Sequence, residues 1–252
     1  YDVSSLQWAI GGGEKTPEAR IRAFSEFFRS ARYIDAYGLT ESVGGDTFME
    51  PGREIEKIGS TGRAIAHVEI EIRDDAGDRL APGENGEICL RGPKVTKGYW
   101  KDPEKTAAAF FGDWFRTGDI GHLDVDGFLY LTDRKKDMII SGGFNVYPQM
   151  IEQAIYTHPS VQEVIVIGIP DDYPGEAAKA FITLRPGARP FTVDELRAFL
   201  AGKLGKHELP AALDFVDELP RTPVGKLSRH ELRMRQSPVQ EHQQAVRQQH
   251  RQ

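Results

Sequence analysis

The sequence predicts an α/β (α+β) fold with three parts: the end of an α/β domain, a small β-barrel-like subdomain, and a small, mobile C-terminal α+β domain. In residues 1–51, a strand-like run, a glycine turn, an amphipathic helical pattern and a second strand-like run follow one another, which is the order of an α/β domain. From residue 52, glycine and proline separate short alternating runs, which is typical of a β-rich subdomain. Helical and strand-like patterns alternate again after residue 148.

The first segment predicts two strands around one helix. Residues 6–10 alternate apolar with polar side chains and predict a strand that stops at the glycines 11–13. Thr16 and Pro17 are expected at the N-cap and the first position of a helix whose apolar face carries residues 21, 24 and 28. Residues 33–36 predict the next strand.

The later segments predict further short elements. The β-rich segment contains the alternating runs 68–72 and 87–90 and one short helix at about 102–110. The C-terminal segment predicts a helix from Pro148 to about residue 158, strands at 161–169, 178–184 and 213–216, and helices after the capping boxes at Thr192 and Ser228. The continuous apolar run 164–167 predicts a strand that is buried on both faces.

The predicted domains are 1–51, 52–134 and 135–236, followed by a tail, 237–252. The tail is rich in Gln, Arg and His and is expected to be disordered. The boundary near residue 135 falls on five charged residues, 133–137 (DRKKD), between two apolar runs. Five consecutive ionised side chains cannot all lie in a core, so they are expected at an exposed turn or at a seam between two domains.

Composition limits the class of protein. The chain has 252 residues, of which 39% are hydrophobic and 28% charged, as is ordinary for a soluble globular protein. The net charge of −6 argues against nucleic acid or an anionic membrane as the partner of the whole chain. No apolar run approaches the ~18 residues that a membrane-spanning helix needs. The single cysteine, Cys89, cannot form an internal disulfide, so a reducing cytoplasm is expected, with Cys89 packed rather than reactive.

Four loops carry residues suited to chemistry. The glycines 11–13 let a flat ring or a phosphate approach the backbone, although a tight turn uses such residues as well. The run 37–41 (YGLTE) follows a strand with an aromatic ring, a hydroxyl and a carboxylate, which suits ligand and magnesium binding or a plain surface turn. Asp119 suits the two hydroxyls of a ribose, or a turn. Lys226 lies in a loop, 221–227, that proline and glycine hold just ahead of a capped helix.

Five motifs, in this order and at this spacing, resemble the adenylate-forming enzyme superfamily of acyl-CoA synthetases, nonribosomal adenylation domains and luciferases. They are YGLTES, GEICLRGPKVTKGYW, WFRTGD, LYLTDRKKDMIISGGFNVYPQMIE and LPRTPVGKLSR. The resemblance covers nearly the whole chain before the glutamine-rich tail. The wording DRKKDMIISGGFNVYP is similar to that of the fatty-acid CoA ligases, whereas nonribosomal adenylation domains usually carry a different phrase there.

The resemblance implies a nucleotide site in the first half of the chain. It places the adenine on Tyr37, beside Gly12 and Gly13, with Gly38 in the same loop. Thr40 would contact the phosphates of ATP, and Glu41 would hold Mg²⁺.

The resemblance also implies a ribose site and a moving domain. Asp119 would bind the ribose hydroxyls with help from Arg134, and Lys136 would be the hinge about which the small domain swings. Lys226 would enter the adenylation site, and Gly142 and Gly143 would line the tunnel for the pantetheine of coenzyme A. The catalytic residues so implied are Thr40, Glu41 and Lys226.

The implied reaction has two steps. The carboxylate of an acid, a fatty acid by this resemblance, attacks the α-phosphate of ATP and gives an acyl-adenylate and pyrophosphate. A cation at Lys226, together with Mg²⁺, stabilises the charge on the phosphate oxygens. The thiol of coenzyme A then displaces AMP after the small domain has moved at its hinge.

The sequence departs from the superfamily in three places. The glycine- and Ser/Thr-rich phosphate loop has no counterpart in this chain, which opens without Met, so it is expected to be the C-terminal portion of a longer enzyme and inactive alone. Glu14 and Lys15 stand where small or apolar residues are usual, and Phe144 stands where many members have an acidic residue. Two alternatives stay open: an aryl or carrier-protein-loading adenylating enzyme, and a nucleotide-binding paralogue without turnover.

Overall fold

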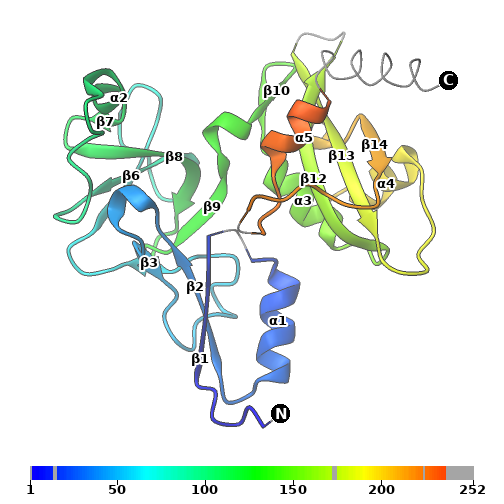
Figure 1. The fold of residues 1–252 in the computed structure, drawn as a ribbon, viewed down its shortest axis with the longest axis horizontal. Helices are drawn as coiled ribbons and strands as arrows, with labels where there is room; N and C mark the ends of the chain where they lie inside the picture. Colours follow the sequence, from blue (N-terminus) through cyan, green and yellow to red (C-terminus); the bar gives the residue numbers. More distant parts are fainter. Residues whose placement is uncertain (1, 14–15, 172–174, 224, 237–252) are drawn as a thin grey trace. The chain divides into compact units, whose positions relative to one another are not determined.

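The computed structural model describes residues 2–13, 16–171, 175–223 and 225–236, and its two compact units divide between Lys136 and Asp137 (Figure 1). Both units contain helices and sheets, so the predicted mixed α/β class is confirmed. Glu14, Lys15 and the predicted tail lie outside the described residues. None of the described helices is long and apolar enough to cross a membrane.

The first unit begins with a four-stranded sheet. Its elements are β1 (Trp8–Gly12), α1 (Glu18–Phe27), β2 (Arg32–Tyr37), η1 (Thr40–Ser42), β3 (Thr47–Phe48) and β4 (Arg63–Ala64). Strands β1 and β2 are parallel and are connected through α1, so both end at the same edge of the sheet. The strand β1 runs through Gly12 instead of stopping at Gly11. The helix starts at Glu18 with Pro17 at the N-cap position, so the predicted cap at Thr16 is wrong: the Thr16 hydroxyl lies 2.8 Å from the Tyr33 hydroxyl instead.

The β-rich part of the first unit is a second sheet. Its elements are β5 (Glu69–Arg73), β6 (Gly86–Arg91), α2 (Pro103–Ala108), β7 (Phe110–Phe111), β8 (Trp114–Leu123) and β9 (Leu129–Arg134). The strand order is β5-β6-β8-β7, and β9 also pairs with β8. Ile88, Leu90 and Leu129 are fully buried between these strands, and Tyr37 of β2 packs into the same cluster. The two sheets of this unit therefore share one apolar core.

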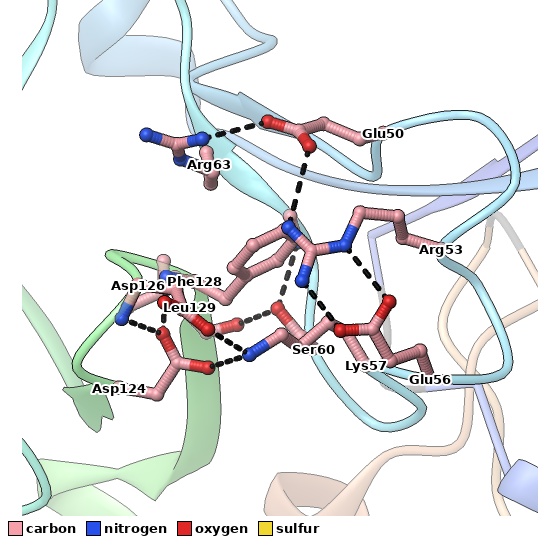
Figure 2. A network of polar contacts seen from close by, with 11 residues as sticks. Glu50, Arg53, Glu56, Lys57, Ser60, Arg63, Asp124, Asp126, Phe128 and Leu129 are labelled. Carbon is pink, nitrogen blue, oxygen red and sulfur yellow. Dashed lines mark hydrogen bonds and ion pairs between the residues drawn. The ribbon is translucent and has the colours of Figure 1, made fainter.

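A polar network closes the turn between β8 and β9 (Figure 2). Phe128 is fully buried, and Arg53 and Lys57 lie 4.6 and 5.0 Å from the centre of its ring. Lys57 also donates to the carboxylates of Asp124 (2.8 Å) and Asp126 (2.6 Å). The loop between β3 and β4 thus fastens the turn of the β8–β9 hairpin.

Because cations lie above the Phe128 ring, we expect its replacement to destabilise the protein more than the loss of apolar volume alone would. The substitution Phe128→Leu keeps an apolar side chain but removes the negatively charged ring face, so we expect the free energy of unfolding to fall by about 1–2 kcal/mol. Urea unfolding measures this loss. The control is Phe115→Leu, because Phe115 is equally buried but packs edge-on against Phe110. Equal losses in the two variants would show that the cations contribute no more than the edge-on ring contact of Phe115 does.

Cys89 lies in the centre of β6 and is fully buried, as the sequence predicts. Burial, and second the nearby carboxylate of Glu87, raise the pKa of its thiol to about 12. Because the thiolate is the reactive species, we expect the folded chain at pH 8 to resist a disulfide thiol reagent and the urea-unfolded chain to react. A spectroscopic thiol titration tests this, and equal rates in the two states would contradict it.

The second unit is an α+β layer structure. Its elements are β10 (Ile139–Ser141), β11 (Phe144–Val146), α3 (Pro148–Tyr156), β12 (Val161–Pro170), β13 (Glu176–Leu184), α4 (Val193–Leu200), η3 (Lys206–Glu208), β14 (Ala212–Phe215) and α5 (Arg229–Arg235). The short η2 (Lys135–Asp137) connects this unit to the first. Strand β12 is antiparallel to β13, and β13 is parallel to β14.

The central sheet of the second unit has a core on each face, as the apolar run 164–167 predicts. These four residues are each at most 1% exposed. Val164 and Val166 face α3, α4 and the β10–β11 hairpin, whereas Ile165 and Ile167 pack with Leu232 of α5. The predicted capping box at Thr192 is present: the Thr192 hydroxyl accepts the Glu195 amide at 3.2 Å, and the Glu195 carboxylate accepts the Thr192 amide at 2.6 Å.

Candidate active site

The glycines predicted to contact a nucleotide lie at the edge where β1 and β2 end. Gly12 is paired with Ala36, the residue before Tyr37. A Cβ atom on Gly12 would come within 3.0 Å of the Ala36 carbonyl oxygen, and Gly13 has φ +87°, a conformation that favours glycine. The structure therefore brings Gly12 to the end of the strand pair beside Tyr37. Steric contact favours glycine at position 12, and the positive φ favours it at position 13.

The loop after Tyr37 is held by Lys94, for which the sequence predicts no role. The ammonium group of Lys94 donates to the carbonyls of Gly44 and Gly45 at 2.5 and 2.7 Å and lies 3.1 Å from a carboxylate oxygen of Asp46. Asp46 is fully buried and also accepts a hydrogen bond from the Ser42 hydroxyl. A side chain at Gly38 would collide with the backbone of Gly44 and Gly45. This packing fixes the turn η1 that carries Thr40 and Glu41.

Glu41 is oriented by Tyr99, whose hydroxyl donates to one of its carboxylate oxygens at 3.0 Å. Thr40, one residue earlier, is exposed. No group of three or more potential metal ligands exists among the described residues. A carboxylate oriented by a hydroxyl suits magnesium, which keeps most of its waters and binds phosphate oxygens with one or two carboxylates. Glu41 would be the residue of this chain that holds such an ion.

The motif Thr117-Gly118-Asp119 forms a β-bulge in β8. Between the pairs Cys89↔Arg116 and Glu87↔Ile120, three residues of β8 lie opposite the single residue Ile88 of β6. The Thr117 hydroxyl donates to the Ile88 carbonyl at 2.8 Å and accepts the Asp119 amide at 3.1 Å. Gly118 has φ +74°, which a residue with a side chain adopts at a cost. Bulges re-aim side chains beside active sites, and this one displaces Asp119 from the β6–β8 ladder while it stays paired with β9.

Asp119 meets two of the predicted nucleotide residues. One of its carboxylate oxygens accepts the Tyr37 hydroxyl at 2.8 Å, and the other lies 3.7 Å from the guanidinium of Arg134, its partner on β9. Burial raises the pKa of Asp119 above its usual value, while the Tyr37 hydroxyl and the Arg134 charge oppose the rise. The Asp119 side chain remains 23% exposed, so a ligand can reach it. Tyr37, Asp119 and Arg134 thus form one connected group.

Tyr37 is more deeply buried than a ring that only stacks on adenine needs to be. Tyr37 is only 7% exposed, and its ring packs among the apolar residues between the two sheets. Burial and the neighbouring carboxylate of Asp119 raise the pKa of Tyr37 well above the usual value, so the hydroxyl keeps its proton and donates a hydrogen bond to Asp119. The structure therefore gives Tyr37 an orienting function, and adenine stacking on Tyr37 stays a prediction.

The charged cluster 133–137 is not a run of solvated side chains. Asp133 and Asp137 are 2% and 6% exposed, whereas Arg134 and Lys136 are exposed. Within the second unit, Arg233 donates to the carboxylate of Asp137 at 2.7 Å and to its backbone carbonyl at 3.2 Å. An exposed turn, one of the two positions expected for this cluster, is therefore wrong for Asp137, which is buried because helix α5 supplies a cation for it. Lys136, the predicted hinge residue, is the last residue of the first unit.

Gly142 and Gly143 form the two-residue turn of the β10–β11 hairpin. Ser141 pairs with Phe144 across the turn, and the two glycines have φ values of +55° and +84°. Positive φ at both central residues is the type I′ geometry that matches the twist of a hairpin. Phe144 is 57% exposed and its ring is stacked on His207, with centroids 4.6 Å apart. The predicted pantetheine loop is thus a short, rigid turn.

Lys226 lies in a tightly hydrogen-bonded loop. The Thr222 amide donates to the Lys226 carbonyl at 2.7 Å, and the Lys226 amide donates to the Thr222 hydroxyl at 3.2 Å. Gly225 has φ +85° and donates its amide to the Thr222 carbonyl at 2.8 Å. The loop backbone is therefore fixed, as proline and glycine predict, and the Lys226 side chain is exposed.

Helix α5 follows the Lys226 loop and is fastened to helix α3. Ser228 caps the helix by accepting the Glu231 amide at 3.2 Å. Arg229 donates to both carboxylate oxygens of Glu152 in α3, which also accepts the Val166 amide of β12 at 2.7 Å. A mostly buried ion pair of this kind breaks only at a high cost, so it fastens α5, the helix that follows the Lys226 loop, to α3.

Comparison with known proteins identifies the family. The model of the AMP-binding enzyme family matches residues 1–100, and that of the AMP-binding enzyme C-terminal domain matches residues 150–226. The chain belongs to the adenylate-forming superfamily of AMP-binding enzymes, as its motifs predict.

The relatives cover several acids. The chain is 40% identical over 221 residues to a long-chain-fatty-acid–CoA ligase of Bacillus subtilis (strain 168), covering 85% of this chain and 38% of that ligase. It is 45% identical over 208 residues to a 2-succinylbenzoate–CoA ligase of Geobacillus kaustophilus (strain HTA426), covering 82% of this chain and 41% of that ligase. The chain thus spans about two fifths of the length of these relatives.

A solved structure has the same fold. It is the o-succinylbenzoate coenzyme A synthetase of Bacillus subtilis in complex with ATP and a magnesium ion. It matches with a TM-score of 0.81 at 35% identity, over 91% of this chain and 46% of that one.

Three residues of the site were not predicted from the sequence. Glu87, Lys94 and Tyr99 all lie inside the quoted motif GEICLRGPKVTKGYW, but they received no role. The sequence does contain a signal for Glu87, because a charged residue stands directly before three apolar residues, Ile88 to Leu90, in the same strand. The structure buries all four residues. Lys94 and Tyr99 carry none, since their partners Asp46 and Glu41 lie about 50 residues away in the chain.

Proposed function

We propose that this chain is the C-terminal portion of an ATP-dependent acid–coenzyme A ligase that works through an acyl-adenylate. The observation that carries the proposal is the connected group of Tyr37, Asp119 and Arg134 at the bulge in β8. It presents a partly exposed carboxylate with an orienting hydroxyl and a cation, which suits the two hydroxyls of a ribose. ATP, Mg²⁺ and coenzyme A are the proposed small-molecule partners.

The chemistry of the proposed residues follows from their charges. Thr40 and Glu41 would hold the phosphates and their magnesium ion, which supplies charge neutralisation at the phosphorus. Lys226 would add a second cation while the acid attacks the α-phosphate. The Gly142-Gly143 turn would line the path of the coenzyme A thiol in the second step, after movement at Lys136.

We further propose a fatty acid as the acid, because the motif wording is similar to that of the fatty-acid ligases and one such ligase is among the relatives. The 2-succinylbenzoate ligase favours an aryl acid as the second candidate. The cytoplasmic location expected from the single cysteine stays a prediction.

The test is acid-dependent exchange of pyrophosphate into ATP by the intact enzyme, followed by coenzyme A-dependent release of AMP. The panel contains a long-chain fatty acid, a medium-chain fatty acid and 2-succinylbenzoate. Exchange with the fatty acids alone supports the full proposal, and exchange with 2-succinylbenzoate alone moves the assignment to an aryl-acid ligase. Absence of exchange with all three acids contradicts both acid assignments, and AMP binding without exchange favours a nucleotide-binding paralogue without turnover over a ligase of these acids.

A further inference from the structure

Glu87 is a buried carboxylate whose position the proposed chemistry leaves unexplained. It lies at the start of β6 and is 4% exposed. One of its oxygens accepts the Gly118 amide at 3.2 Å. The other accepts from the Arg116 guanidinium at 2.9 Å and from the Lys135 ammonium at 3.0 Å.

The two oxygens of Glu87 hold two different parts of the first unit. Gly118 is the residue at positive φ in the bulge, directly before Asp119. Lys135 is directly before Lys136, the last residue of the first unit. Lys135 also forms an ion pair with Asp75 at 2.5 Å, but the Asp75 side chain is 90% exposed. Ion pairs so exposed to solvent contribute little to stability.

We propose that Glu87 is a positioning residue that holds the Asp119 bulge and the Lys135 side of the hinge with a single carboxylate, so that loss of this carboxylate loosens both. The inference rests on the proposed function for the roles of Asp119 and Lys136. It adds a connection within the first unit between the ribose site and the residue at which the domain is expected to swing.

The chemistry of the carboxylate explains why this position requires Glu. A carboxylate has two acceptor oxygens, one for the bulge and one for the two cations, whereas the amide of Gln has one acceptor and one donor group. An amide turned with its oxygen toward Gly118 points its NH₂ group at Lys135 and Arg116. An amide turned the other way points its NH₂ group at the Gly118 amide. The substitution Glu87→Gln therefore keeps the size of the side chain and cannot satisfy both ends.

The experiment compares wild-type chain with Glu87→Gln by amide hydrogen exchange and by calorimetric titration with AMP. We expect exchange of the Gly118 amide and of the amides of residues 135–137 to be about tenfold faster in the variant, since a charge-assisted hydrogen bond is lost. We also expect the dissociation constant for AMP to rise about tenfold, because Asp119 moves with the bulge.

Two matched variants separate this role from a general loss of stability. The variant Lys135→Gln removes only the hinge contact, so exchange should quicken at residues 135–137 while Gly118 exchange and AMP affinity stay unchanged. The variant Glu71→Gln removes another ion-paired carboxylate of the same sheet: Glu71 lies 2.6 Å from Arg73 and contacts neither Gly118 nor Lys135. It should change none of the three readouts.

Three results would overturn the proposal. They are a change at only one end in Glu87→Gln, the same changes in Glu71→Gln, and a uniform rise in exchange across all amides. If the wild-type chain does not bind AMP, the proposal that the ribose site is preformed in this chain is contradicted. The hydrogen-exchange pattern then decides the role of Glu87 by itself.

Discussion

Replacing Lys226 with Ala is expected to abolish the first half-reaction of the intact ligase and to spare the second. The charge that develops on the phosphate oxygens requires a fixed cation, and removing one such group costs on the order of 10³-fold in rate. The hydrogen bonds of Thr222 and Gly225 hold the loop through its backbone, so the substitution leaves the loop intact. Pyrophosphate exchange measures the first half-reaction, and thioester formation from supplied acyl-adenylate measures the second.

The control for Lys226→Ala is Lys203→Ala. Lys203 is an exposed lysine of the same unit that lies against the ring of Phe199, 3.6 Å from its centre. Its removal subtracts the same charge from the unit, and we expect both half-reactions to continue. An equal loss of both half-reactions in Lys226→Ala would contradict a role for Lys226 in adenylation.

Replacing Asp119 with Ala is expected to weaken AMP binding by the chain by about 100-fold, because two hydroxyl-to-carboxylate hydrogen bonds are lost. The isosteric Asp119→Asn should weaken binding less, since one acceptor oxygen remains for the ribose. Calorimetric titration with AMP measures both effects. The control is Asp113→Asn, an exposed aspartate in the turn before β8. AMP affinity equal to wild type in Asp119→Ala would remove the ribose assignment.

Because the pKa of Asp119 is raised, ionisation of its carboxyl is expected to favour AMP binding but to lower the stability of the fold. The ionised form binds the ribose, so AMP affinity should fall on acidification at a higher pH than the usual 3.8 of an aspartate implies. A folded-state pKa above the unfolded one stabilises the protein below the unfolded value, and this stability is lost as pH rises through the folded value. At neutral pH the buried charge therefore costs stability. We expect Asp119→Asn to unfold at an equal or higher urea concentration while it binds AMP less tightly.

A drop in urea midpoint for Asp119→Asn would contradict this account. It would mean that the Asp119 charge stabilises the fold through Arg134 more than burial destabilises it. The titration with AMP would remain valid, because it is read from binding and not from stability.

Most elements of the fold follow from local patterns in the sequence. Alternation predicts β1, a continuous apolar run predicts β12, and capping residues predict α4, because these signals lie within about ten residues of one another. The start of α1 differs, since Thr16 forms a long-range contact with Tyr33 in place of the cap. A single tertiary hydrogen bond decides such boundaries, and the local pattern does not contain it.

The sequence by itself determined which residues carry the proposed chemistry, because motif order and spacing are one-dimensional properties. Only the tertiary structure decided how those residues are held. The bulge that turns out Asp119, the hydroxyl of Tyr37 that orients it, and the carboxylate of Glu87 that reaches both Gly118 and Lys135 join segments that lie roughly 30 to 80 residues apart. The burial of Asp137 depends in the same way on Arg233, 96 residues later. A buried charge needs a partner, and which distant residue supplies it depends on how the strands and helices pack.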